Sequence, residues 1–212
     1  FRSCSLPSIG MEWELQLLNP HTFDLVDGIL PLLANCSADP SIKPEYSQCM
    51  VEINSKPCEN IQELTVDITA ILTTLQENCR ELGMAVCGGG THPFNNRFTN
   101  VTPLPRYLVQ GRGAGYLGDL SITFALHIHV GMPSGDAAIA VMDKLQPYLP
   151  ILLALAASSP FWWGNNTGYA SFRQRFLAIG RTFGLPPDFK NWQDFAHFFR
   201  SARSAVGSLT AN

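Results

Sequence analysis

Apolar and polar residues alternate in three short segments, which we therefore predict to be the main strands of a sheet. These segments are residues 10–18, 48–54 and 122–130, and their period of two is typical of half-buried strands. We expect a short return strand near 26–30 and another short strand near 84–87. Each main strand should bury its apolar face against helices and present its polar face on the other side of the sheet.

A different spacing predicts a long helix between the second and third main strands. Asn60 can cap its first turn, Glu63 follows in the capping-box position, and Gly83 provides the stop. Its apolar residues recur at helical spacing, at Ile61, Leu64, Ile68, Ile71, Leu72, Leu75 and Leu82. This stripe should face the core.

Two further helices are expected in the second half of the chain. One should begin at Asp136 as its cap and continue to about Ser158, with a kink at its prolines. It contains the most apolar stretch, 145–157, which is shorter than the ~20 residues that span a bilayer, so we expect a buried helix and no membrane. The other should cover about 191–205. Residues 95–120, rich in Gly and Pro, are expected to be irregular.

Composition limits the classes of protein that fit. The 212 residues are 46% hydrophobic and 15% charged, which favours one globular domain over residues 1–212. Strands and helices mix without regular βαβ alternation, which favours an α+β fold. The net charge of −3 argues against a nucleic-acid partner. The six cysteines form no C-x-x-C pair, which favours free thiols. The first residues show no basic region followed by an apolar run, and we therefore expect a cytoplasmic protein.

The polar faces of the predicted strands carry the candidate chemistry. The acids and imidazoles on them are Glu12, Glu14, Glu52, His127 and His129, and Glu45 could reach the same surface. Strand geometry places Glu12 and Glu14 about 7 Å apart on one face. Such like charges repel unless a cation lies between them, and the oxygen-rich set suits Mg²⁺ or Mn²⁺. The alternative is an ordinary solvated strand face.

No familiar nucleotide-binding motif accounts for this surface. The sequence has no Walker A motif. Gly113, Gly115 and Gly118 match G-x-G-x-x-G, but the next predicted strand begins about four residues later and leaves no room for a phosphate-binding helix. We therefore expect a flexible loop there. A serine nucleophile elbow is also missing from the sequence.

Longer motifs resemble the carboxylate–amine ligase family related to glutamate–cysteine ligase. They are Gly10-Met11-Glu12-Trp13-Glu14, Glu45 with Val51-Glu52-Ile53-Asn54, Gly90-Thr91-His92-Pro93-Phe94, Thr102-Pro103 with Arg106-Tyr107, Ala125-Leu126-His127-Ile128-His129-Val130-Gly131, Leu155-Ala156-Ala157-Ser158-Ser159-Pro160-Phe161, Thr167-Gly168-Tyr169-Ala170-Ser171-Phe172-Arg173 and Asn191-Trp192. The ordered set covers about residues 8–200.

The resemblance implies a glutamine-synthetase-like antiparallel sheet with helices on one face and ATP, Mg²⁺ (or Mn²⁺) and an amino acid on the other. Members phosphorylate a carboxylate and displace phosphate with an amine, so glutamate and cysteine are the expected substrates. The implied metal ligands are Glu14, Glu45 and Glu52 at one site and Glu12 and His127 at a second. Glu52 and Arg173 are implied catalytic residues, His129 and Arg173 contacts of the nucleotide, and Arg106 and Thr91 contacts of the substrate.

The chain departs from the family pattern at three points. Asn166 replaces an acidic residue before Thr167, and residues 111–118 replace a more polar helical segment. Family members are also longer, which implies an N-terminal portion with an incomplete sheet and weak or no activity alone. A guanidino kinase-like phosphotransferase on the same fold and an inactive metal- or nucleotide-binding remnant remain alternatives. A homo-oligomer is compatible with the sequence.

Overall fold

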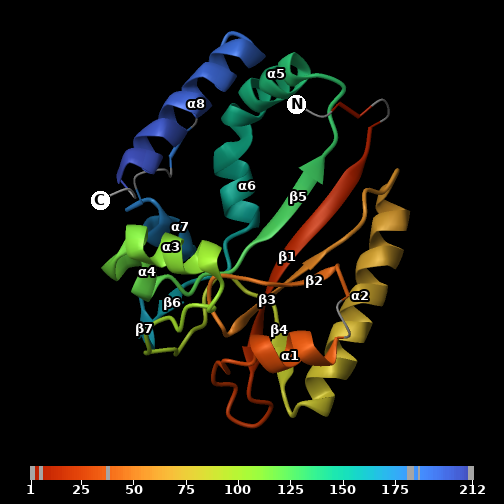
Figure 1. Cartoon of the computed structure of the whole chain (residues 1–212), viewed down its shortest axis with the longest axis vertical. Coiled ribbons are helices and arrows are strands. Elements are labelled where there is room, and N and C mark those ends of the chain that lie inside the picture. The colour runs from red at the N-terminus through yellow and green to blue at the C-terminus, as the bar shows by residue number, and fades with distance from the viewer. Residues whose placement is uncertain (1–2, 5–6, 37–38, 181–183, 186, 210–212) are drawn as a thin grey trace.

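The central feature of the fold is an antiparallel sheet built around one long strand (Figure 1). The computed structural model describes residues 3–4, 7–36, 39–180, 184–185 and 187–209. Strand β1 (Ile9–Leu18) pairs along one edge with β3 (Met50–Asn54), which in turn pairs with β2 (Ile42–Pro44). Its other edge pairs first with β5 (Leu126–Val130) and then with β4 (Ala85–Cys87). The main predicted strands are thus neighbours through β1.

Two helices cover one face of this sheet. Helix α1 (Ile29–Asn35) and helix α2 (Ile61–Glu81) pack on the alternating apolar residues of β1 and β3. The buried cluster comprises Leu15, Leu17, Ile29, Leu32, Cys36, Ile42, Val51, Ile53, Leu75, Cys79 and Met84. Burial of so many apolar side chains makes this layer the main source of hydrophobic stabilisation.

The predicted ends of the long helix are confirmed. The side chain of Asn60 accepts a hydrogen bond from the backbone N–H of Glu63 at 2.9 Å, while the Glu63 carboxylate accepts from the N–H of Glu59. Gly83 follows the helix with a φ of 68°, a left-handed conformation that glycine adopts without strain. The return strand expected near 26–30 is wrong: Leu25 forms an isolated bridge with Leu18, and α1 follows at once.

The Gly- and Pro-rich segment 95–120 contains two helices that were not predicted. Helix α3 (Pro105–Ala114) begins with proline in its first turn, where no intrahelical N–H is needed, and buries Tyr107. Helix α4 (Tyr116–Leu120) follows after Gly115, whose φ of 55° separates the two. The expectation of a flexible loop over the G-x-G-x-x-G match is therefore wrong, because packing outweighs the low helix propensity of glycine.

The predicted 136–158 helix is present but is capped and divided differently. Ser134, rather than Asp136, accepts from the N–H of Ala137 and caps α5 (Gly135–Leu145). A 3₁₀ turn, η1 (Gln146–Tyr148), and α6 (Leu149–Leu155) follow, each with a proline in its first turn. Asp136 instead accepts a 2.8 Å hydrogen bond from the N–H of Trp192, at the start of α8 (Trp192–Leu209).

A small aromatic unit connects α6 to α8. Strands β6 (Phe161–Trp162) and β7 (Asn165–Asn166) form a hairpin, and α7 (Phe172–Leu177) follows it. Trp162 stacks on Phe176 with ring centroids 4.9 Å apart. This contact holds α7 against the hairpin and fixes the start of α7, from which Arg173 projects.

The apolar stretch of residues 145–157 and the apolar face of β5 are exposed, which corrects two expectations. Leu155 is 80% exposed and Ile151 57%, so this helix is not buried. In β5, Leu126, Ile128 and Val130 are each about half exposed, at 49%, 51% and 57%. The helical segment Gly135–Leu155 is long and apolar enough to cross a membrane, which for a single helix is weak evidence.

Candidate functional site

The strand register brings the predicted acids and imidazoles together on the uncovered face of the sheet. Glu14 lies directly opposite Glu52, and Glu12 lies directly opposite His127. Gly10 lies opposite His129. Directly opposed residues of an antiparallel pair project to the same side, so the alternation that buries Leu15 and Leu17 also collects these polar side chains on one surface.

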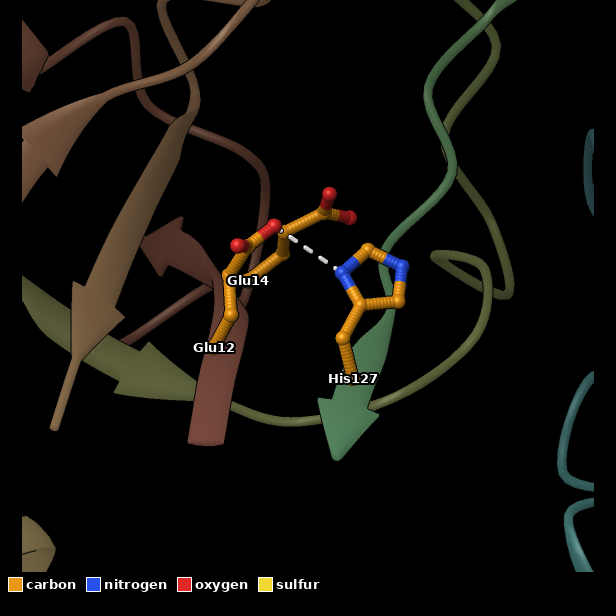
Figure 2. Close-up of side chains that lie close together, drawn as sticks. All are labelled: Glu12, Glu14 and His127. Carbon is orange, nitrogen blue, oxygen red and sulfur yellow. Dashed lines mark hydrogen bonds and ion pairs between the residues drawn. The ribbon is translucent and has the colours of Figure 1, made fainter. Parts of the chain in front are cut away.

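The first group of possible metal ligands consists of Glu12, Glu14 and His127 (Figure 2). Each offers one ligand atom, and these atoms lie within 4.8 Å of one another. The Nδ1 of His127 forms a 2.9 Å hydrogen bond with Oε1 of Glu12. The Nε2 of His129 lies 3.3 Å from the other carboxylate oxygen of Glu12, so the second histidine contacts one member of this group.

The second group consists of Glu14, Glu45 and Glu52, whose ligand atoms also lie within 4.8 Å of one another. Glu14 therefore belongs to both groups. Glu52 is 8% exposed and accepts a hydrogen bond from the side chain of Asn54. Glu45 precedes β3 in the sequence and reaches the group from the loop after β2, as the sequence suggested.

Burial and neighbouring charges shift the pKa values of these carboxylates in different directions. Burial, followed by the nearby charge of Glu45, raises the pKa of Glu14 to about 7, against the opposing effects of His127 and Arg173. Burial likewise raises the pKa of Glu52, and the charges of Glu12 and Glu45 add to this. Partial burial of Glu12 is outweighed by hydrogen bonds and charge from both histidines, which lower its pKa. A divalent cation would relieve this repulsion.

Arg173 approaches the same groups from α7. Its backbone N–H donates to the hydroxyl of Ser159 at 3.2 Å, and its Nε is buried with no hydrogen-bond partner in the described parts of the chain. Burial lowers its pKa, while the charge of Glu14 raises it. A Cβ at Gly90 would lie 3.3 Å from Cδ of Arg173, so the glycine turn before Thr91 leaves room for this side chain.

The remaining two predicted residues, Thr91 and Arg106, have different surroundings. Thr91 is 6% exposed, and its hydroxyl donates to the carbonyl of Phe161 at 3.0 Å, so it links the glycine turn to the hairpin. Arg106 is exposed in the first turn of α3. Its guanidinium lies over the ring of Tyr107 and donates to the carbonyl of Pro44, which places it next to Glu45.

Sequence reasoning missed four residues that border the carboxylates. Lys43 lies directly opposite Glu52 in the β2–β3 register, and the exposed Cys87 lies opposite Gln16 on β1. Asn54 and Tyr107 donate to Glu52 and Glu45. The alternation of residues 48–54 already placed Asn54 on the face of Glu52, whereas Lys43 required the three-residue strand β2 to be predicted.

A family model for glutamate–cysteine ligase family 2 matches residues 8–208 of the chain. The chain belongs to this family. A relative from Trichormus variabilis, named "Putative glutamate--cysteine ligase 2", is 58% identical over 205 residues, which cover 97% of this chain and 53% of the relative. A relative of the same name from Gloeobacter violaceus is 38% identical, and the match covers 92% of this chain and 54% of the relative. The chain spans about half the length of these relatives.

Two solved structures share the fold of this ligase-family chain. A glutamate–cysteine ligase from Francisella tularensis in complex with AMP has a TM-score of 0.58 at 13% identity, covering 81% of this chain and 43% of that chain. A bifunctional glutathione synthetase from Pasteurella multocida has a TM-score of 0.69 at 14% identity, and the match covers 95% of this chain and 30% of that chain. The predicted α+β fold, an antiparallel sheet with helices on one face, is confirmed.

Proposed function

We propose that this chain is part of an ATP- and Mg²⁺-dependent carboxylate–amine ligase of the glutamate–cysteine type. The observation that carries the proposal is the pair of ligand groups that share Glu14 on the uncovered face of the sheet, in a chain of glutamate–cysteine ligase family 2. The reaction phosphorylates a carboxylate with ATP and then displaces phosphate from the acyl phosphate with an amine.

The donor set fits hard divalent cations. Glu14, Glu45 and Glu52 would hold one Mg²⁺ or Mn²⁺ ion, and Glu12, Glu14 and His127 a second. When bound, these ions supply positive charge that offsets the repulsion between a substrate carboxylate and the triphosphate. These carboxylates would hold the ions. Burial, followed by the charge of Glu45, raises the pKa of Glu14, and burial together with the charges of Glu12 and Glu45 raises the pKa of Glu52, so a bound cation would favour the ionised form of both acids.

The cationic side chains around the groups have separate proposed roles. His129, which shares Glu12 with His127, would face the phosphates of ATP. Arg173 is suited to stabilise charge on the transferred phosphoryl group, because its guanidinium is partly buried and its Nε has no hydrogen-bond partner among the described residues. Arg106, at the rim beside Glu45, is a proposed contact for a substrate carboxylate. Thr91 would support the substrate pocket through the glycine turn.

The chain spans about half of its relatives, so we propose that residues 1–212 form one catalytic domain whose sheet is completed by further polypeptide. The half-exposed apolar side chains of β5 support this view. The finer features of the proposal are cytoplasmic location, glutamate and cysteine as substrates and a possible homo-oligomer. They rest on the resemblance to the family.

Release of ADP tests the proposal directly. The chain and a version extended to the length of the Trichormus relative are incubated with ATP and Mg²⁺, with glutamate present and cysteine added or omitted. We expect ADP and an amide from the extended protein only when both amino acids are present. Glu52→Gln should lower kcat/KM by more than ~100-fold, whereas Glu77→Gln, exposed on α2, should have no effect.

Other outcomes would favour the alternatives. ADP release that requires a guanidino acceptor and yields no amide would identify a phosphotransferase on this fold. The absence of turnover from both proteins across a panel of acids and amines would leave a binding remnant and overturn the ligase proposal.

A further inference from the structure

Two glycines of segment 111–118, Gly111 and Gly118, lie against the buried side chain of Tyr46. A Cβ added at Gly111 would lie 3.1 Å from the hydroxyl oxygen of Tyr46, and one added at Gly118 would lie 2.8 Å from the same atom. Tyr46 is only 7% exposed. Glycine weakens a helix, so a glycine inside one calls for a packing reason. Here the missing side chains make room for the end of the tyrosine ring.

The backbone of this tyrosine is fixed to the segment that precedes α3. The hydroxyl of Thr102 donates to the carbonyl of Glu45 at 2.6 Å, and the N–H of Thr102 donates to the carbonyl of Tyr46 at 2.8 Å. The N–H of Gln48 donates to the carbonyl of Asn100 at 2.9 Å. Residues 45–48 are therefore held by both backbone and side-chain contacts.

The carboxylate next to this tyrosine is that of Glu45, a member of the second ligand group. It accepts a 2.8 Å hydrogen bond from the N–H of Tyr46 and a 3.4 Å bond from the hydroxyl of Tyr107. Tyr107 belongs to α3 and also donates to the carbonyl of Pro44 at 2.6 Å. Tyr107 of α3 thus contacts the Pro44 carbonyl and the Glu45 side chain, while Thr102, just before α3, binds the carbonyl of Glu45.

We propose that α3 and α4 form a positioning device for Glu45. Gly111 and Gly118 admit the ring of Tyr46, and Tyr107 binds the Pro44 carbonyl beside Glu45. Glu45 is thereby held within reach of Glu14 and Glu52. The inference deepens the proposed function and rests on it for the role of Glu45 as a metal ligand. It gives the glycine-rich segment a physical role that its resemblance to a phosphate-binding loop did not provide.

Gly113 offers a matched control within the same helix. A Cβ at this position would have no atom within 4 Å, so Gly113→Ala changes the helix propensity of α3 without touching Tyr46. Gly111→Ala makes the same chemical change and pushes on the ring. Tyr46→Phe removes the atom that is crowded, and this hydroxyl has no hydrogen-bond partner in the described residues, so no bond is lost.

The inference is tested by measuring the binding of Mn²⁺ to the 212-residue chain by isothermal titration calorimetry. Gly111→Ala should weaken Mn²⁺ binding at the group of Glu14, Glu45 and Glu52 by ~10-fold, the usual size of an effect from a residue that supports a ligand. Binding at the group that contains His127 should be unchanged. Gly113→Ala should bind like the wild type, and Gly111→Ala with Tyr46→Phe should regain the lost affinity. Tyr107→Phe should weaken binding at the same group as Gly111→Ala.

Hydrogen exchange separates this inference from the proposed function. In Gly111→Ala the N–H of Thr102 and that of Tyr46 should exchange faster than in Gly113→Ala, and Tyr46→Phe should restore protection. A wild-type chain that binds no Mn²⁺ would overturn the proposed metal site, while the exchange rates would still decide whether the glycines position residues 45–46. Equal exchange and equal binding in the two alanine variants would overturn the positioning role.

Discussion

Two regions of this chain, β1 with its covering helices and β5 with α6, have similar sequence patterns and very different surroundings. Leu15 and Leu17 of β1 are 2% and 0% exposed beneath α1 and α2, whereas Leu126 and Ile128 of β5 are about half exposed. Both strands alternate apolar and polar residues. Alternation therefore identifies which face of a strand is apolar, and only the packed neighbours decide whether that face is buried.

The helices show the same contrast. Leu75 and Cys79 of α2 belong to the buried cluster, although Ile61 of the predicted core-facing stripe is 56% exposed. In α6, by contrast, Ile151 and Leu155 are 57% and 80% exposed. The free energy of unfolding should therefore be concentrated in the layer of β1, β3, α1 and α2. The proposed completion of the sheet by further polypeptide would give the β5–α6 side the cover that the first region already has. Three predictions test this difference.

The largest effect should come from truncating matched leucines in the two regions. Leu75 in α2 is 0% exposed and Leu155 in α6 is 80% exposed. Leu75→Ala should lower the free energy of unfolding by about 2–5 kcal/mol, because it leaves a cavity in the core, and Leu155→Ala should change it by less than about 0.5 kcal/mol. Urea unfolding measures both. Equal losses would show that α6 is as firmly packed as α2.

The second effect is a dependence of the free energy of unfolding on pH, which we expect from Glu14 on β1. The pKa of this acid is raised to about 7 in the folded chain from an ordinary value of 4.5. The folded state therefore holds the proton more tightly, and stability should fall as the pH rises from about 4.5 to about 7. The loss of stability is on the order of 3–4 kcal/mol, since one pKa unit corresponds to about 1.4 kcal/mol.

Glu14→Gln should remove this part of the pH dependence and make the metal-free chain more stable than the wild type at pH 8. The measurement is urea unfolding at several pH values with a chelator present, and the raised pKa of Glu52 should leave a smaller slope of the same sign. Added Mn²⁺ should stabilise the wild type more than the variant. The same dependence of stability on pH in the wild type and in Glu14→Gln would contradict the prediction.

The smallest effect should come from the helix caps. Asn60 caps α2 and Ser134 caps α5, each by accepting a backbone N–H. Asn60→Ala should cost about 1 kcal/mol in the free energy of global unfolding. Ser134→Ala should instead speed hydrogen exchange in the first turn of α5 and leave the urea midpoint nearly unchanged, because that helix lies in the exposed region. Equal midpoint shifts would show that the two regions unfold as one.

The sequence predicted those parts of the fold in which local pattern and packing agree. The alternation in residues 10–18 and the Asn60 cap each led to a confirmed element. Helices α3 and α4 were missed because the glycines in them lower helix propensity, and the burial of Tyr46 and Tyr107 that compensates comes from a long-range contact. The burial expected for residues 145–157 failed because hydropathy does not show what a helix packs against.

The candidate site was predictable to a similar degree. Glu12, Glu14, Glu52 and His127 could be placed on one surface because the strands that carry them are neighbours. The supporting contacts were not predictable, since they depend on tertiary packing. Tyr107 and Glu45 are 62 residues apart, and the N–H of Arg173 donates to the hydroxyl of Ser159 across a hairpin that was not predicted. The ligand and catalytic roles of all these residues remain predictions.

The position of Cys87 offers a chemical handle on the site. This exposed thiol lies opposite Gln16, on the same side of the sheet as the carboxylates, whereas Cys36, Cys49, Cys58 and Cys79 are buried. A maleimide reagent should therefore modify Cys87 readily and leave the four buried thiols intact in the folded chain. Occupancy of the face by metal and nucleotide then becomes measurable by mass spectrometry, as a slower rate of alkylation at one residue, without any catalytic turnover.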